Sequence, residues 1–107
     1  MVAPSSKRKF SFGQQIHHKL FDYYGVIIAV DSYFKGDDQW YEMMTRSCPP
    51  KDKPWYHVMV DGERHTTYVA EKNLEIDAGA KPIKHILLGT VFGGFENGVY
   101  IPKLRSN

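Results

Sequence analysis

Short apolar runs separated by turn residues recur along most of this chain, and no helical periodicity extends beyond two turns. Residues 14–20 follow Gly13 and place Ile16 and Leu20 on the same face of a predicted strand. Residues 26–30 read Val-Ile-Ile-Ala-Val, an apolar run without a polar residue. Such a run predicts a strand that is buried on both faces.

The strongest local signal is a predicted β-hairpin. Two β-rich runs, 55–60 and 63–70, are joined by Asp61-Gly62. Asp-Gly favours a type I′ turn, because this turn requires positive φ at both central residues. We therefore expect a two-residue turn, which would place His57 opposite Thr66 in the hairpin.

Four further segments give weaker signals. Residues 39–44 favour a strand over one helical turn, and residues 46–54, which contain three prolines, predict a loop. We expect a single turn at 71–74 and a strand at 74–76 that closes the sheet. Short strands with turn signals between them indicate a small all-β barrel or sandwich.

The pattern weakens after Asp77. Glycines at positions 89, 93, 94 and 98 predict an irregular segment. Within it, residues 83–88 are expected to form a short helix or an ordered crossing. Residues 99–102 are expected to add an edge strand, where the proline at their end is tolerated.

Size and composition are typical of one soluble globular domain. The chain has 107 residues, of which 42% are hydrophobic and 24% charged. We expect a basic leader over 1–9 and a single domain over 10–107. A lone cysteine, Cys48, excludes an intramolecular disulfide and suits the reducing cytoplasm, or the nucleus of a eukaryote. The sequence has neither a secretory signal nor an apolar run long enough for a membrane span, so no membrane partner is expected.

Positive charge is concentrated at the two ends of the chain. Residues 21–80 contain six basic and eleven acidic residues, although the whole chain has a formal net charge of +2. The basic residues of the ends would form one patch if both ends lay on the same side of the fold. Alternatively, both ends are simply solvated.

The sequence gives little support for catalysis. It contains no nucleophile motif, phosphate-binding glycine loop or zinc-protease motif. His17 and His18 should point to opposite faces of their strand, and His57 and His65 to opposite faces of the hairpin. We therefore expect neither a metal site nor a cofactor, and a protein that is not an enzyme.

Aromatic residues make up 14% of the chain, and most of them are expected to be core or loop anchors. The alternative is a binding surface, since exposed aromatic rings can stack on bases or surround a methylated ammonium group. Trp40 and Tyr41, beside an acidic turn, are the aromatic residues expected to be exposed.

Four motifs together resemble one known family. They are Gly-Gln-Gln-Ile-His-His at 13–18, Tyr-Gly-Val-Ile-Ile at 24–28, Pro-Trp-Tyr-His-Val-Met-Val at 54–60 and Thr-Tyr-Val-Ala-Glu-Lys-Asn-Leu at 67–74. In this order they resemble the YccV-like, HspQ-type family of hemimethylated-DNA-binding proteins, whose bacterial representative is a heat-shock protein. The C-terminal part is more similar to the version of this domain in certain eukaryotic F-box proteins, on the basis of 39–43, His85, Leu88-Gly89, Phe92, Phe95, Gly98 and 100–102.

The resemblance implies an SH3-like β-barrel, with a short irregular or helical C-terminal extension and without catalytic activity. Positions that match the family motifs are expected first to define the barrel: Gln14, Gly25, Trp55, Tyr56, Tyr68, Glu71 and Asn73. Gly25 is expected to serve the turn into the buried strand. Among the matching positions, His18 and His57 are the best suited to contact a ligand.

Two functions follow from the resemblance. The first is binding of double-stranded DNA, including hemimethylated duplexes, and its candidate contacts are Lys7, Arg8, Lys9, His18, Lys19, His57, Lys103 and Arg105. The alternative is an adaptor or specificity factor for an ATP-dependent protease or a ubiquitin-type degradation system, contacted through Trp40 and Tyr41. An enzyme is a third hypothesis that no residue pattern favours.

Overall fold

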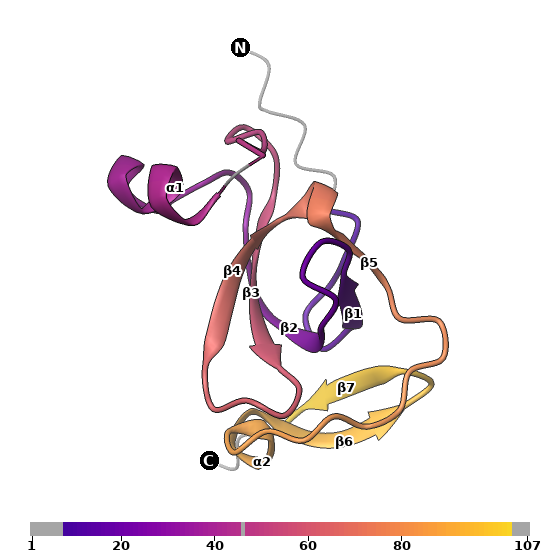
Figure 1. The fold of residues 1–107 in the computed structure, drawn as a ribbon. Coiled ribbons are helices and arrows are strands. Elements are labelled where there is room, and N and C mark those ends of the chain that lie inside the picture. Colours follow the sequence, from indigo (N-terminus) through magenta and orange to yellow (C-terminus); the bar gives the residue numbers. More distant parts are fainter. Residues whose placement is uncertain (1–7, 46, 104–107) are drawn as a thin grey trace.

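Five antiparallel strands form the main sheet of the computed structural model, which describes residues 8–45 and 47–103 (Figure 1). In spatial order they are β4 (Thr66–Ala70), β3 (Trp55–Val60), β2 (Tyr24–Asp31), β1 (Gln15–His18) and β5 (Leu74–Ile76). Each predicted strand up to residue 76, apart from the one at 39–44, corresponds to one of these five. The all-β fold class is confirmed.

The main sheet is strongly curled, as the positions of its two edge strands show. β4 and β5 lie at opposite edges of the sheet but are consecutive strands in the sequence. Only η1 (Glu71–Asn73), a single 3-10 turn, separates β4 from β5. One turn can connect the two edges of a five-stranded sheet only if the sheet bends round. The result is the expected small barrel-like domain, visible as a ring of strands in Figure 1.

Two cores pack on the two faces of this curled sheet. The inner core contains Phe10, Ile16, Ile27, Tyr56, Val58, Val69 and Leu74. On the outer face, Val26 and Met59 pack against residues of the C-terminal segment. Val26 and Ile27 point to opposite faces and are both fully buried, as the apolar run predicts. Ala29 beyond the bulge in β2 is exposed, so the prediction fails for the second half of the run.

Residues 38–44 form a helix, α1 (Asp38–Met44), so the strand expected at 39–44 is wrong. Asp37 is its N-cap, and the Asp37 carboxylate accepts a hydrogen bond of 2.7 Å from the Trp40 backbone N–H. This contact satisfies one of the free N–H groups of the first turn and favours a helix over a strand. The helix then packs Trp40 and Tyr41 onto the aromatic residue Phe34.

The hairpin of β3 and β4 is confirmed, but its predicted register is wrong by two residues. His57 pairs with Tyr68, not with Thr66. Gly62 has a positive φ of 81° and Asp61 does not have a positive φ, so the turn is not of type I′. The Asp61 side chain instead accepts a bond of 2.8 Å from the Lys84 backbone N–H, which ties the turn to the C-terminal segment.

The C-terminal segment forms a second, two-stranded sheet. A four-residue helix, α2 (Leu88–Val91), leads into β6 (Phe92–Glu96), which pairs with β7 (Val99–Pro102). The strand at 99–102 was predicted, whereas β6 lies where an irregular segment was expected. Asn97 and Gly98 both have positive φ, 53° and 78°, and join the two strands as a type I′ turn requires.

Gly25 lies inside β2 rather than in the turn before it, which corrects its expected role. It pairs with Val60, and a Cβ atom at Gly25 would lie 2.5 Å from Val58 Cγ1 and 2.6 Å from the Met59 carbonyl oxygen. Glycine is therefore required here by the close approach of β3.

No helix among the described residues has the length and apolar character needed to cross a membrane.

Candidate functional site

Three exposed lysines meet at the end of the sheet that carries η1. The Lys9 backbone N–H donates to Glu71 Oε2 (3.1 Å), and the Lys19 backbone N–H donates to the Asn73 carbonyl (2.8 Å). Lys72 lies between these two anchor residues within η1. The strand ends thus fix the backbones of Lys9, Lys19 and Lys72 around one short turn. We call these three residues the basic end.

The lysines of the basic end are exposed to solvent. Among residues 8–45 and 47–103, none of the three forms an ion pair. The neighbouring Glu71 carboxylate accepts a hydrogen bond of 2.6 Å from the Tyr56 hydroxyl in addition to the Lys9 N–H. Burial, together with this bond to Glu71, raises the pKa of Tyr56 and keeps its hydroxyl as a donor. The three ammonium groups are therefore available to an anion.

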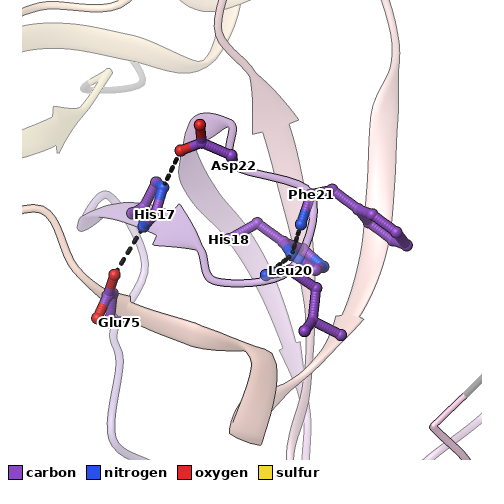
Figure 2. A network of polar contacts seen from close by, with 6 residues as sticks. All are labelled: His17, His18, Leu20, Phe21, Asp22 and Glu75. Atoms are coloured by element: carbon purple, nitrogen blue, oxygen red, sulfur yellow. Dashed lines mark hydrogen bonds and ion pairs between the residues drawn. The ribbon is translucent and has the colours of Figure 1, made fainter.

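The turn between β1 and β2 presents two apolar side chains beside Lys19. Leu20 is 59% exposed and Phe21 is 67% exposed. His18 holds the turn, since its Nδ1 accepts the backbone N–H groups of both residues at 3.2 and 3.1 Å (Figure 2). Burial, followed by the charge of the neighbouring His17, lowers the pKa of His18 and favours the neutral ring that these bonds need. His18 is 3% exposed, so it positions the turn.

His17 clamps the same turn to β5 from the opposite face of β1. Its Nε2 lies 2.7 Å from Asp22 Oδ1 and its Nδ1 lies 2.7 Å from Glu75 Oε2 (Figure 2). Hydrogen bonds to Asp22 and then Glu75 raise the pKa of His17, because two carboxylates favour a ring protonated on both nitrogens. The two adjacent histidines point to opposite faces of β1, as predicted, and their different surroundings shift their pKa values in opposite directions.

A cluster of aromatic side chains occupies the junction of α1 with the sheet. Its members are Phe34, Trp40, Tyr41, Trp55 and Tyr68. Trp40 and Tyr41 are half-buried in this cluster rather than exposed, which corrects the expectation for them. The Lys51 ammonium lies 4.3 Å from the centre of the Tyr41 ring and covers it. Of the two residues, Trp40 lines a groove of about 1060 Å³ that runs beside β4.

His57, Asp31 and Tyr68 form a polar group on the wall of this groove. The Tyr68 hydroxyl donates to Asp31 Oδ2 at 2.6 Å, and His57 Nε2 lies 3.3 Å from the same oxygen. Burial raises the pKa of Asp31, but the bonds from Tyr68 and His57 outweigh it and hold the pKa below its ordinary value. Asp31 is therefore a carboxylate. The geometry holds the Tyr68 ring against His57, at 4.5 Å between centres.

Among the described residues, the lysines of the two charged chain ends lie apart. Lys103 lies near α2, where its Nζ donates to the Gly89 carbonyl at 3.3 Å, whereas Lys9 lies beside η1 at the other end of the sheet (Figure 1). Arg8 is exposed next to Lys9. Lys7 and Arg105, both candidate DNA contacts, lie outside the described residues. The structure brings Lys9 and Lys19 together and separates both from Lys103, and it places half-exposed His57 at the groove.

The positions that match the family motifs take part in packing and hydrogen bonding. Trp55 and Tyr56 are buried, and Gln14 Oε1 accepts the Ser11 N–H at 3.0 Å. Glu71 and Asn73 anchor the two lysine backbones described above. Sequence reasoning missed Lys72 and the exposed Leu20-Phe21 pair. The sequence feature that could have indicated them is their position in or next to the recognised motifs, beside Lys19 and Asn73.

The described residues contain no group of three or more histidine, cysteine, aspartate or glutamate side chains that could hold a metal ion. Cys48 is exposed.

Comparison with known families matches most of this chain to a family model. The model described as "YccV-like: Hemimethylated DNA-binding protein YccV like" matches residues 8–99. The matched range contains the whole main sheet, the basic end and the groove beside β4.

Proposed function

The chain belongs to the YccV-like family, whose model describes a hemimethylated DNA-binding protein, and we propose that this protein binds DNA through its basic end. The observation that carries the proposal is the family match over 8–99. The exposed ammonium groups of Lys9, Lys19 and Lys72, which form no ion pair within the described part of the chain, support it, because lysines that neutralise phosphates release the counterions of the duplex. In this proposal the basic end positions the protein on the DNA backbone.

In the same proposal, the turn between β1 and β2 contacts the bases. Leu20 and Phe21 project beside Lys19, and His18 and His17 hold the turn from its two sides. A methyl group on a base in the major groove is recognised by apolar contact. An exposed phenyl ring next to a phosphate-binding lysine has the chemistry for such a contact. Phe21 is therefore proposed to distinguish a methylated strand from an unmethylated one.

Fluorescence anisotropy across a salt series tests the proposal, with matched unmethylated, hemimethylated and fully methylated duplexes. We expect the hemimethylated duplex to bind most tightly, with affinity falling as salt rises. In the triple variant Lys9→Gln/Lys19→Gln/Lys72→Gln, each lost phosphate contact should reduce the slope of log affinity against log salt by about 0.9. Phe21→Ser should keep the slope and lose the preference among duplexes.

The control removes the same charge from the other end of the molecule. Lys81, Lys84 and Lys103 are exposed near the C-terminal hairpin. The variant Lys81→Gln/Lys84→Gln/Lys103→Gln should keep the wild-type slope. Equal slopes for the two triple variants would contradict the assignment of the basic end. Weak and identical binding of the wild-type protein to all three duplexes would contradict the proposed function itself.

A further inference from the structure

β4 has one edge that no other strand covers. β3 is the only strand bonded to β4 in the described part of the chain. The Glu71 backbone N–H donates to the Pro54 carbonyl at 3.1 Å, directly beyond the β3–β4 pairing. Because bonding alternates along an antiparallel strand, Val69 and Thr67 also bond to β3. Thr66 and Tyr68 therefore direct their backbone N–H and C=O groups to the uncovered edge.

The groove beside β4 follows this uncovered edge. Tyr68 and Thr66 lie on one face of β4, and Thr67 and Val69 lie on the other, yet all four line the same groove. A groove can touch both faces of one strand only by passing along its edge. Backbone donors and acceptors that bond to no other strand among the described residues thus lie along the floor of a groove of about 1060 Å³. Such groups bind a further strand readily.

The two walls of the groove are apolar. One wall contains Trp40 and Met44 of α1, which stands beside the upper part of β4 in Figure 1. Trp40 lies against Tyr68, at 5.8 Å between ring centres. The opposite wall contains Leu20 and Phe21 of the β1–β2 turn. A strand laid along β4 would place alternate side chains against these two walls.

The charges of the groove favour a polypeptide over a nucleic acid. Its charged residues are Asp31, Asp37 and Lys35, two acids and one base. Both carboxylates already accept hydrogen bonds from within the protein, from Tyr68 and from the Trp40 N–H. Lys35 is thus outnumbered, and the groove has no excess of positive charge to attract phosphates. It combines backbone hydrogen-bonding groups with apolar pockets, the two elements of recognition by strand addition.

We propose that the groove binds an extended segment of another polypeptide, which adds to the free edge of β4 and inserts large apolar side chains between α1 and the β1–β2 turn. This second interaction does not require the lysines of the basic end, although it uses Phe21 of the β1–β2 turn, which is also proposed to contact DNA bases. It uses hydrogen bonds from Thr66 and Tyr68 for affinity and the walls formed by Trp40 and Phe21 for selectivity.

Selection from a library of displayed random peptides, followed by hydrogen exchange on the complex, tests this proposal. In the free protein, the amides of Thr66 and Tyr68 should exchange fast and those of Thr67 and Val69 slowly. A selected peptide should protect Thr66 and Tyr68 and carry large apolar residues at alternate positions. Methylation of the peptide's own backbone nitrogens at alternate positions should weaken binding about tenfold or more, without any change to the protein.

Trp40→Ala should weaken the same peptides, while Tyr33→Ala, a matched change at an exposed aromatic residue outside the groove, should not. Thermal unfolding of both variants shows whether each remains folded. Failure to enrich any peptide, or peptides that leave Thr66 and Tyr68 unprotected, would overturn the proposal. Protection that rises with protein concentration alone would assign the edge to a second copy, and protection by duplex DNA would assign the groove to nucleic acid; either result would also overturn it.

Discussion

The basic end and the β4 groove lie on the same curled sheet but differ in how they can bind a partner. The basic end consists of three long, exposed ammonium side chains whose backbones alone are fixed, by bonds to Glu71 and Asn73. The groove consists of aromatic rings that contact each other and of a strand edge. Mobile charges bind a repeating phosphate backbone with strong salt dependence, whereas rigid aromatic walls select a shape.

The two regions share one element, the turn between β1 and β2. Lys19 of this turn belongs to the basic end, while Leu20 and Phe21 line the groove. Changes in the scaffold or in Phe21 should therefore affect both regions, whereas changes in the lysines of the basic end or in Trp40 of the groove should each affect only one. The following variants test this difference in order of expected effect.

Gly25→Ala should damage both regions together. The added Cβ would lie 2.6 Å from the Met59 carbonyl oxygen, so β2 and β3 would have to move apart. Overpacking against backbone should lower the free energy of unfolding by about 3 kcal/mol, measured by urea denaturation. Gly89→Ala is the matched control, since its added Cβ would meet no atom within 4 Å outside its chain neighbours and the backbone of its own helix. Equal stability of the two variants would contradict the close approach of β3.

Elements that depend on short-range contacts could be predicted from the sequence, whereas elements that depend on contacts between distant residues could not. The apolar run at 26–30 and the turn at 71–74 depend on burial and short-range bonding, and both elements are present. The register of β3 and β4 could not be predicted, because the Asp61 side chain bonds to Lys84, twenty-three residues away. By contrast, Asn97-Gly98 carries the local hairpin signal that predicts β6 and β7, and the glycines around it obscured this signal.

The candidate site shows the same limit. Lys19 and Lys9 were recognised as basic residues, but their meeting with Lys72 depends on bonds to η1 from two distant segments. Trp40 was expected to be exposed but is half-buried. Its burial could not be predicted, because the cluster around it combines residues from α1, β3 and β4. The free edge of β4 is a property of strand order, which the pattern of apolar residues does not specify.

Tyr68→Phe should affect the groove and spare the basic end. It removes the hydroxyl that donates to Asp31 at 2.6 Å and accepts the Lys35 N–H at 3.1 Å. Loss of these bonds should lower the free energy of unfolding by about 1 kcal/mol. The pKa of Asp31, measured by NMR titration, should rise towards its ordinary value, and the salt slope of duplex binding should stay at the wild-type value. Tyr33→Phe, which leaves the Asp31 contacts intact, is the control.

His17→Gln should make the smallest change, and this change should depend on pH. Asp22 and Glu75 raise the pKa of His17 above its ordinary value of 6.5, so the clamp stabilises the folded state fully below pH 6.5. That contribution is lost as the pH rises through the raised pKa of the folded protein. Both carboxylates are well exposed to solvent, so the free energy of unfolding of the wild-type protein should exceed that of the variant by less than about 1 kcal/mol.

Urea denaturation at about pH 5.5 and about pH 9 measures this difference, which should be present at the lower pH and absent at the higher one. His65→Gln, at an exposed histidine without an ion pair in the described part of the chain, should show no such dependence. Because the clamp holds the turn that carries Lys19, duplex affinity should follow the same pH dependence as stability. A stability difference that is equal at both pH values would show that His17 acts through packing on Tyr24, 4.8 Å away between ring centres, and not through its charge.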